Sequence, residues 1–213
     1  MKTSSGPFEQ LAERLYEGDA PGVERLIGEA LEQGTGAAAI LGKGLIAGMD
    51  RVGRDFQSGE LFVPELIVAA RAMHAGLDLL RPGLARQGER SLGTAVLGTV
   101  KGDLHDIGKR LVGIMMEGQG LRVVDLGHDV APERFVEAAR EEGAELVGMS
   151  ALLSTTMPMM RTTLEALRQA DLGVLTLVGG APVTQRWADE IGADGYAPDA
   201  VAAAARAREL LQR

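Results

Sequence analysis

Residues 96–108 read Val96-Leu97-Gly98-Thr99-Val100-Lys101-Gly102-Asp103-Leu104-His105-Asp106-Ile107-Gly108. An apolar run that ends in a glycine-bearing loop is typical of a strand that delivers its loop to a ligand crevice in an open α/β sheet. We therefore expect His105 to lie at the carboxyl end of a strand. The carboxylate of Asp103, two residues earlier, is placed to orient the imidazole as a hydrogen-bond acceptor.

Strand and helix patterns alternate outward from this stretch to the end of the chain. Strands are expected at residues 94–100, 122–126, 146–150, 174–178 and 195–196, and a helical pattern follows each of them. Five strand–helix units in succession predict a parallel sheet with right-handed crossovers, and we expect the flavodoxin-like strand order 2-1-3-4-5. In that order the loops that carry His105 and Ser150 flank one crevice.

The first half of the chain carries helical patterns alone. Apolar residues recur at helical spacing near residues 8–15, 23–31, 45–56 and 64–80, which predicts a four-helix bundle. The proline- and charge-bearing stretch 81–91 is expected to divide the chain. The predicted fold class is α/β, with a helical domain at residues 1–85 followed by a flavodoxin-like, Rossmann-type domain with a five-stranded parallel sheet at residues 86–213.

Composition narrows the classes of partner. The formal net charge of −8 argues against nucleic acid or an anionic membrane as a main partner, because phosphate binding needs a basic face. Residues 1–18 lack the apolar core of a signal peptide, and no later segment is apolar for long enough to span a bilayer. We therefore expect a cytoplasmic protein.

A metal site built by the protein alone is not expected. The chain has no cysteine, and its three histidines, His74, His105 and His128, are far apart in the sequence. A macrocycle that already supplies the equatorial ligands needs only one axial donor, and a single imidazole suffices there. His105 is the candidate metal ligand, whereas His74 and His128 are interpreted as surface or interface residues.

Three short motifs resemble the signature of cobalamin-binding domains. They are Asp103-x-His105-x-x-Gly108, Ser150-x-Leu152 and Gly179-Gly180, and both their order and their spacing match. Each alone has a simpler interpretation: a loop histidine bonded to an aspartate, a capping or turn hydroxyl, and a glycine turn. Their combination favours the family.

The resemblance implies specific roles. The nucleotide base of the corrinoid would leave cobalt and enter the crevice, and His105 would replace it below the metal. Catalytic roles would fall to His105, Asp103 and Thr156, with Thr156 supplying the relay hydroxyl for which many relatives use serine. Ser150 would hydrogen-bond the displaced base and Leu152 would pack on it. The cofactor-binding residues expected in this half are Gly102, Asp103, Leu104, His105, Asp106, Ile107, Gly108, Ser150, Leu152, Ser154, Thr155, Gly179, Gly180 and Ala181.

Residues 48–65 of the helical half resemble the cap module of methyl-transferring corrinoid proteins. The resemblance implies that this module shields the upper face of the corrin. It would have to open for every transfer, so residues 81–91 are expected to act as a hinge. Its candidate cofactor-binding residues are Met49, Val52, Phe56 and Phe62. The simpler interpretation is that these side chains form the core of the bundle.

The resemblance as a whole implies a corrinoid methyl carrier that binds methylcobalamin, cob(I)alamin or a related corrinoid. A substrate-specific methyltransferase and a thiol or folate acceptor methyltransferase would be its partners, together with a reductive activase. Such a subunit is not expected to complete turnover alone. The alternatives are a cobalamin-dependent regulator or light sensor, the cofactor subunit of an adenosylcobalamin mutase, and a signalling module without cofactor. The methyl donor and the oligomeric state stay open.

Overall fold

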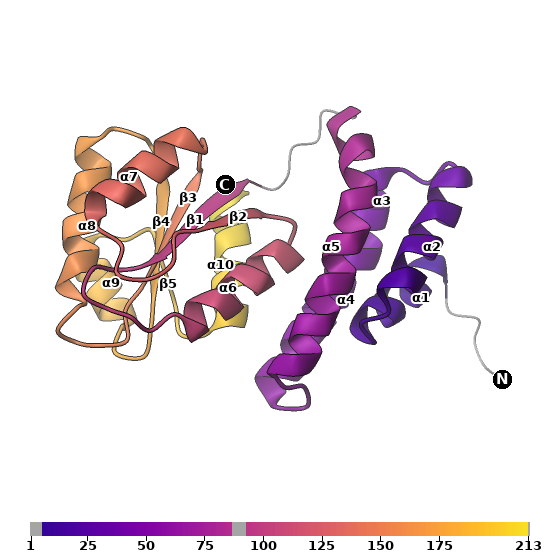
Figure 1. The fold of residues 1–213 in the computed structure, drawn as a ribbon, viewed down its shortest axis with the longest axis horizontal. Coiled ribbons are helices and arrows are strands. Elements are labelled where there is room, and N and C mark those ends of the chain that lie inside the picture. The colour runs from indigo at the N-terminus through magenta and orange to yellow at the C-terminus, as the bar shows by residue number, and fades with distance from the viewer. Residues whose placement is uncertain (1–5, 87–92, 213) are drawn as a thin grey trace. The chain divides into compact units, whose positions relative to one another are not determined.

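A computed structural model describes residues 6–86 and 93–212 and divides the chain into two units. One unit comprises residues 1–91, with which residues 117–120 are grouped, and the other comprises the remaining residues from 92 onward. The first unit is helical and the second is an α/β domain (Figure 1). The fold class is therefore confirmed. The exact domain boundary between residues 85 and 86 stays a prediction.

The helical unit is built from four rods. They are α1 (Pro7–Tyr16), α2 (Ala20–Glu32), a continuous rod of α3 (Ala37–Ile40), the π-helical η1 (Leu41–Ile46) and α4 (Ala47–Ser58), and finally α5 (Val63–Arg86). Asp19 caps α2 by accepting a hydrogen bond from the Gly22 N–H at 3.0 Å, and Gly59 ends α4 in the left-handed conformation. The largest buried side chains of this unit are Leu15, Ile27, Ile40, Leu45, Met49, Leu66, Met73 and Leu80.

The predicted dividing stretch begins within a helix. Residues 81–86 are helical, because α5 continues through Pro82 to Arg86. Leu84 extends the helical spacing of Leu77 and Leu80, so the apolar pattern runs on past the proline, which removes one backbone donor without ending the helix. The rest of the proposed hinge falls on residues 87–91, outside the described part of the chain.

The α/β unit alternates strands and helices as predicted. Its elements are β1 (Thr94–Thr99), α6 (Ile107–Gly118), β2 (Arg122–Asp125), α7 (Pro132–Glu141), β3 (Leu146–Ser150), α8 (Pro158–Gln169), β4 (Leu175–Gly179), α9 (Gln185–Ile191), β5 (Gly195–Ala197) and α10 (Ala200–Leu211). All pairs are parallel, and the strand order is β2-β1-β3-β4-β5. The predicted topology is confirmed.

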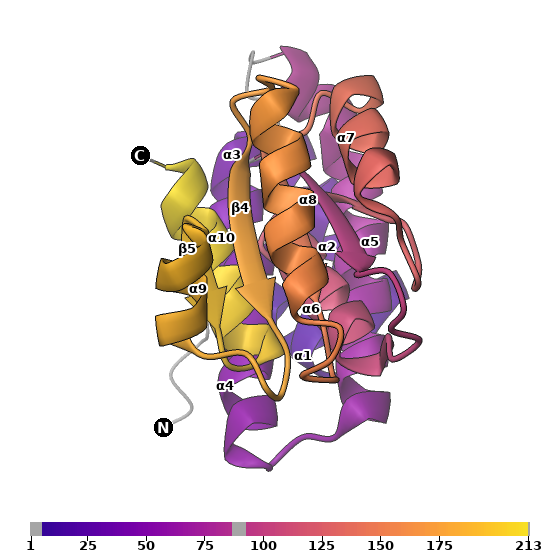
Figure 2. The same cartoon turned by 90° about the vertical axis from the view of Figure 1, so that its left-hand side faces the viewer.

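The helices cover both faces of the sheet. Helices α7, α8 and α9 lie on one face, and α6 and α10 lie on the other (Figures 1 and 2). Every residue of the interior strand β1 is buried, as expected for a strand covered on both sides. Among the described residues, no helix is long and apolar enough to cross a membrane.

Phe135 anchors α7 on the sheet. Its ring is fully buried and lies directly over Gly98 of β1, where an added Cβ would come within 2.5 Å of the ring. Val96, Met149 and Leu164 belong to the same core. Trp187, the single tryptophan of the chain, packs against this core from α9, so its fluorescence reports unfolding of the α/β unit.

We predict that Phe135→Ala lowers the free energy of unfolding of the α/β unit by about 3–5 kcal/mol, because it leaves a cavity over β1. Urea titration followed by Trp187 fluorescence measures the change. The matched control is Arg134→Ala, which alters an exposed neighbour on the same helix and is expected to stay within about 1 kcal/mol of the parent. Equal stabilities for the two variants would contradict the central place of Phe135.

Candidate functional site

The site lies where the loops after β1 and β3 leave the sheet. Thr99 and Ser150, the last residues of these two strands, are paired in register. The first loop turns at Gly102, whose φ of +83° favours glycine, and then leads into α6. β1 has β2 on one side and β3 on the other, so the order of the strands reverses between β1 and β3. The loops after β1 and β3 therefore lie at the switch point that the sequence predicts.

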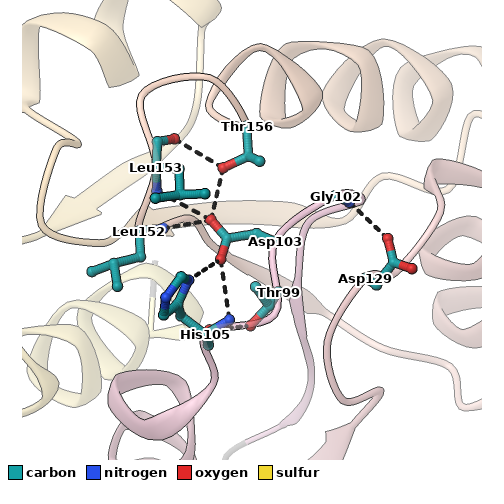
Figure 3. A network of polar contacts seen from close by, with 8 residues as sticks. All are labelled: Thr99, Gly102, Asp103, His105, Asp129, Leu152, Leu153 and Thr156. Carbon is teal, nitrogen blue, oxygen red and sulfur yellow. Dashed lines mark hydrogen bonds and ion pairs between the residues drawn. The ribbon is translucent and has the colours of Figure 1, made fainter.

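Asp103 joins the two loops through its carboxylate (Figure 3). Its side chain is fully buried and accepts five hydrogen bonds. Oδ1 accepts from the His105 N–H at 3.1 Å and lies 2.8 Å from His105 Nδ1. Oδ2 accepts from the N–H groups of Leu152 and Leu153 at 2.8 and 3.1 Å and from the Thr156 hydroxyl at 2.7 Å.

These contacts keep Asp103 ionised. Burial alone would raise the pKa of this carboxyl. The hydrogen bonds from Thr156, His105 and the Leu152 N–H outweigh burial and hold the pKa of Asp103 well below its usual range. Asp103 is therefore a fixed negative charge and an acceptor for the imidazole.

His105 points outward from this buried anchor. Its side chain is 52% exposed, and Nδ1 is turned toward Asp103, which places the ring proton on Nδ1. The Thr99 hydroxyl donates to the His105 carbonyl at 3.0 Å and fixes the backbone. Among the described residues, none hydrogen-bonds Nε2. The lone pair of Nε2 is thus available to a ligand from outside.

Large apolar side chains are exposed close to His105 in the sequence and on the second loop. Leu104 is 65% exposed and Ile107 is 77% exposed, and Leu152 and Leu153 are each 43% exposed. Apolar residues concentrated in this way mark an interaction site, because water solvates them poorly. One outward imidazole among apolar side chains suits a flat macrocycle with a metal at its centre.

The remaining predicted residues fall on the same edge of the sheet. Gly102 and Asp106 flank Asp103 and His105 on the first loop, and Gly108 lies in the first turn of α6. Ser154 and Thr155 are exposed on the second loop, and Ser150 is half-buried at the end of β3. Gly179, Gly180 and Ala181 follow at the end of β4.

The glycine pair serves the chain's own packing. Gly180 has a φ of +132°, and a Cβ there would lie 1.9 Å from the carbonyl oxygen of Ala151. The Ala151 N–H donates to the Gly179 carbonyl at 3.2 Å. Glycine is therefore required for the loops after β3 and β4 to meet, with or without a ligand between them.

The predicted contacts in the helical unit differ in exposure. Met49 and Val52 are fully buried, Phe56 is half-buried, and Phe62 is 66% exposed before α5. Gly48, in the same stretch, faces α1, and its added Cβ would approach Ala12 Cα to 3.2 Å. The assignment of all four as corrin contacts stays a prediction.

Sequence reasoning missed two polar residues that support the first loop. The carboxylate of Asp129 accepts a hydrogen bond from the Gly102 N–H at 2.7 Å. Lys109, which is only 4% exposed, forms an ion pair with Asp125 at the end of β2. Neither residue lies in a motif, so only the fold reveals their place beside the loop.

The fold and the site together define the class of cobalamin-binding α/β domains joined to a helical bundle. A family described as B12 binding domain matches residues 93–205, and a second B12 binding domain family matches residues 7–81. The chain therefore belongs to the family of corrinoid proteins with a B12-binding domain, and cobalamin or a related corrinoid is its cofactor.

Several relatives carry names that agree with this membership. Dimethylamine corrinoid protein 3 of Methanosarcina acetivorans is 48% identical over 174 residues, which are 81% of this chain and 82% of that protein. A corrinoid protein of Desulfitobacterium hafniense is 40% identical over 209 residues, 96% of this chain and 97% of that protein.

Solved structures agree as well. The methanol:cobalamin methyltransferase complex of Methanosarcina barkeri contains a chain that matches with a TM-score of 0.81 and 27% identity, covering 99% of this chain and 81% of that one. A cobalamin-binding protein from Desulfitobacterium hafniense matches with a TM-score of 0.76 and 31% identity, covering 93% of this chain and 96% of that one.

We predict that Asp103→Asn lowers the stability of the cofactor-free protein by about 2–4 kcal/mol, because an amide leaves some of the five donors unpaired. The pKa of Asp103 is lower in the folded than in the unfolded chain, so its contribution is complete above the unfolded pKa and is lost as the pH falls through the acid range. The difference between parent and variant should therefore shrink below about pH 5.

Urea titrations followed by Trp187 fluorescence at several pH values measure this difference. Asp171→Asn makes the same chemical change at an exposed loop residue and is the control. A constant difference at all pH values would contradict the ionised state of Asp103.

Proposed function

We propose that this protein is a methyl carrier that holds cobalamin with the nucleotide base off cobalt and His105 as the lower axial ligand. It passes a methyl group from a substrate-specific methyltransferase to a thiol or folate acceptor methyltransferase. The observation that carries the proposal is the outward Nε2 of His105, held by a buried and ionised Asp103.

The residues present fit the group. A corrin ring supplies the equatorial ligands of cobalt, so one imidazole completes the lower face. Leu104, Ile107 and Leu152 offer exposed apolar surface beside that imidazole, which a large ring would bury. When bound, the corrinoid supplies a cobalt ion that accepts and releases the methyl group.

The chain's own part is to set the strength of the axial donor. Asp103 accepts a hydrogen bond from the Nδ1–H group of His105. This bond fixes the tautomer and makes Nε2 a stronger electron-pair donor. The low pKa of Asp103 keeps this acceptor negatively charged.

Thr156 supports the contact between Asp103 and His105 from the other side of the carboxylate. Its Oγ1 lies 2.7 Å from Asp103 Oδ2 and 2.8 Å from the Leu153 carbonyl oxygen. A hydroxyl has one proton, so it donates to one of these oxygens at a time, and the charged carboxylate is the stronger acceptor. Threonine thus provides the hydroxyl contact for which the resemblance implies serine in many relatives.

The partners are proposed from the names of similar proteins. Dimethylamine, trimethylamine and monomethylamine corrinoid proteins are among them, and one matching structure is a methanol:cobalamin methyltransferase complex. We propose a methyltransferase for a small methylated compound as the donor partner. An acceptor methyltransferase and a reductive activase complete the proposed system.

The ligand assignment predicts that His105→Ala still binds cobalamin but loses protein coordination of cobalt. Protein labelled with the heavy nitrogen isotope is loaded with unlabelled cobalamin, reduced by one electron, and examined by electron paramagnetic resonance. A histidine ligand splits the cobalt lines into doublets and the cofactor's own base splits them into triplets, because the two isotopes differ in nuclear spin.

Wild type is expected to give doublets, which disappear in His105→Ala. His128→Ala removes an exposed histidine of the same unit and should keep the doublets. Triplets in the wild type would refute the proposed coordination.

The carrier function predicts that the reduced, cobalamin-loaded protein takes up one methyl group per bound cofactor from methyl iodide. It should keep this group until an acceptor methyltransferase is added, because the chain itself offers no thiol. Labelled methyl iodide followed by gel filtration measures uptake and retention. Failure to become methylated, together with a light-dependent change in oligomer size of the adenosylcobalamin form, would favour the sensor alternative.

A further inference from the structure

Asp129 stands in an unusual backbone conformation beside the histidine loop. It lies between β2 and α7 with a φ of +55°, in the left-handed region that few residues other than glycine adopt. Asp171, with a φ of +50°, is the other non-glycine residue of the described chain with positive φ. Such a conformation persists where the surrounding contacts hold it in place.

The contacts of Asp129 are reciprocal and fall on neighbouring backbone groups. Its Oδ1 accepts from the Gly102 N–H at 2.7 Å, and its own N–H donates to the Asp103 carbonyl at 2.9 Å. The left-handed turn lets one residue make both bonds. Asp129 therefore holds the loop just before His105 through two hydrogen bonds.

Asp129 contacts the loop on the side away from the crevice between the loops after β1 and β3. Figure 3 shows Asp129 on one side of Gly102, and Leu152, Leu153 and Thr156 on the other. The strand order agrees, because β2 and β3 lie on opposite sides of β1. Asp129 therefore acts on the loop without facing the region proposed for the corrin.

The loop that carries Asp129 is itself fixed to β1. The Val130 N–H donates to the Thr99 carbonyl at 2.9 Å, and the Thr99 N–H donates to the Gly127 carbonyl at 3.0 Å. Asp125 accepts from the Gly127 N–H at 2.8 Å and pairs with the buried Lys109. A rigid support on the β2 side is therefore joined to the histidine loop through Asp129.

We propose that Asp129 is a positioning residue for the axial ligand. It fixes the backbone before His105 and so holds Nε2 where it would coordinate cobalt. This inference rests on the proposed function. Asp103 sets the orientation of the ring within the loop, and Asp129 sets the position of the loop itself. Loss of the Asp129 side chain leaves the contact between Asp103 and His105 intact but lets the loop that carries both residues move.

The test measures the ratio of histidine-bound to unbound cobalt in isotope-labelled, cobalamin-loaded protein by electron paramagnetic resonance. Asp129→Gly keeps the left-handed turn but removes the acceptor, and we expect this ratio to fall about fivefold, as for one exposed charge-assisted hydrogen bond. Asp129→Asn tolerates the same turn and keeps a side-chain oxygen, so it should restore most of the ratio.

Asp171→Gly is the matched control, since it makes the same substitution at the other left-handed aspartate. It should leave the ratio unchanged. A wild-type ratio in Asp129→Gly would overturn the inference and leave the proposed function intact. An equal fall in Asp129→Asn or in Asp171→Gly would also overturn it. A wild type without histidine coordination would instead refute the proposed function.

Discussion

The buried carboxylate of Asp103 is the interaction on which this site depends. A buried charge is stable only when donors surround it, and here five hydrogen bonds come from residues on both sides of the switch point. Separation of the loops after β1 and β3 would remove the three hydrogen bonds that Leu152, Leu153 and Thr156 donate to this charge. The same contacts that close the sheet edge therefore hold the imidazole in one orientation, so the geometry of the site is built into the stability of the domain.

The exposed fraction of the side chains changes sharply from Asp103 to His105. Asp103 is inaccessible to solvent, whereas His105 is half-exposed and Leu104 between them is 65% exposed. This division follows from the strand order, because a loop at the switch point has one end in the core and its tip outside it. The exposed apolar side chains cost solubility in the free protein, and a bound ring would cover them. The site is organised before the ligand arrives, so little of the binding free energy is spent on ordering it.

The sequence predicted the features that rest on local pattern. Alternating apolar runs gave the five parallel strands and their order, and the spacing of Asp103, His105 and Ser150 gave the loops that meet. What escaped prediction depends on packing: α5 runs through Pro82 because its apolar face continues, and Gly180 is needed because Ala151 lies against it. Asp129 and Lys109 carry no motif, and their place beside the loop follows from strand β2 lying next to β1. Register and topology brought these residues together, and no window of sequence contains both partners.

Thr156, at a position where the resemblance implies serine in many relatives, follows the same logic. A β-branched side chain has a restricted χ1, so its hydroxyl has fewer directions to take. Thr156 is buried, its methyl group lies beside Gly102, and its Oγ1 is within hydrogen-bond distance of Asp103. The methyl group thus fills space next to the loop and keeps the hydroxyl aimed at the carboxylate. The substitution retains the hydrogen bond and reduces the entropy lost in forming it, which suits a site whose task is to hold one imidazole in one orientation.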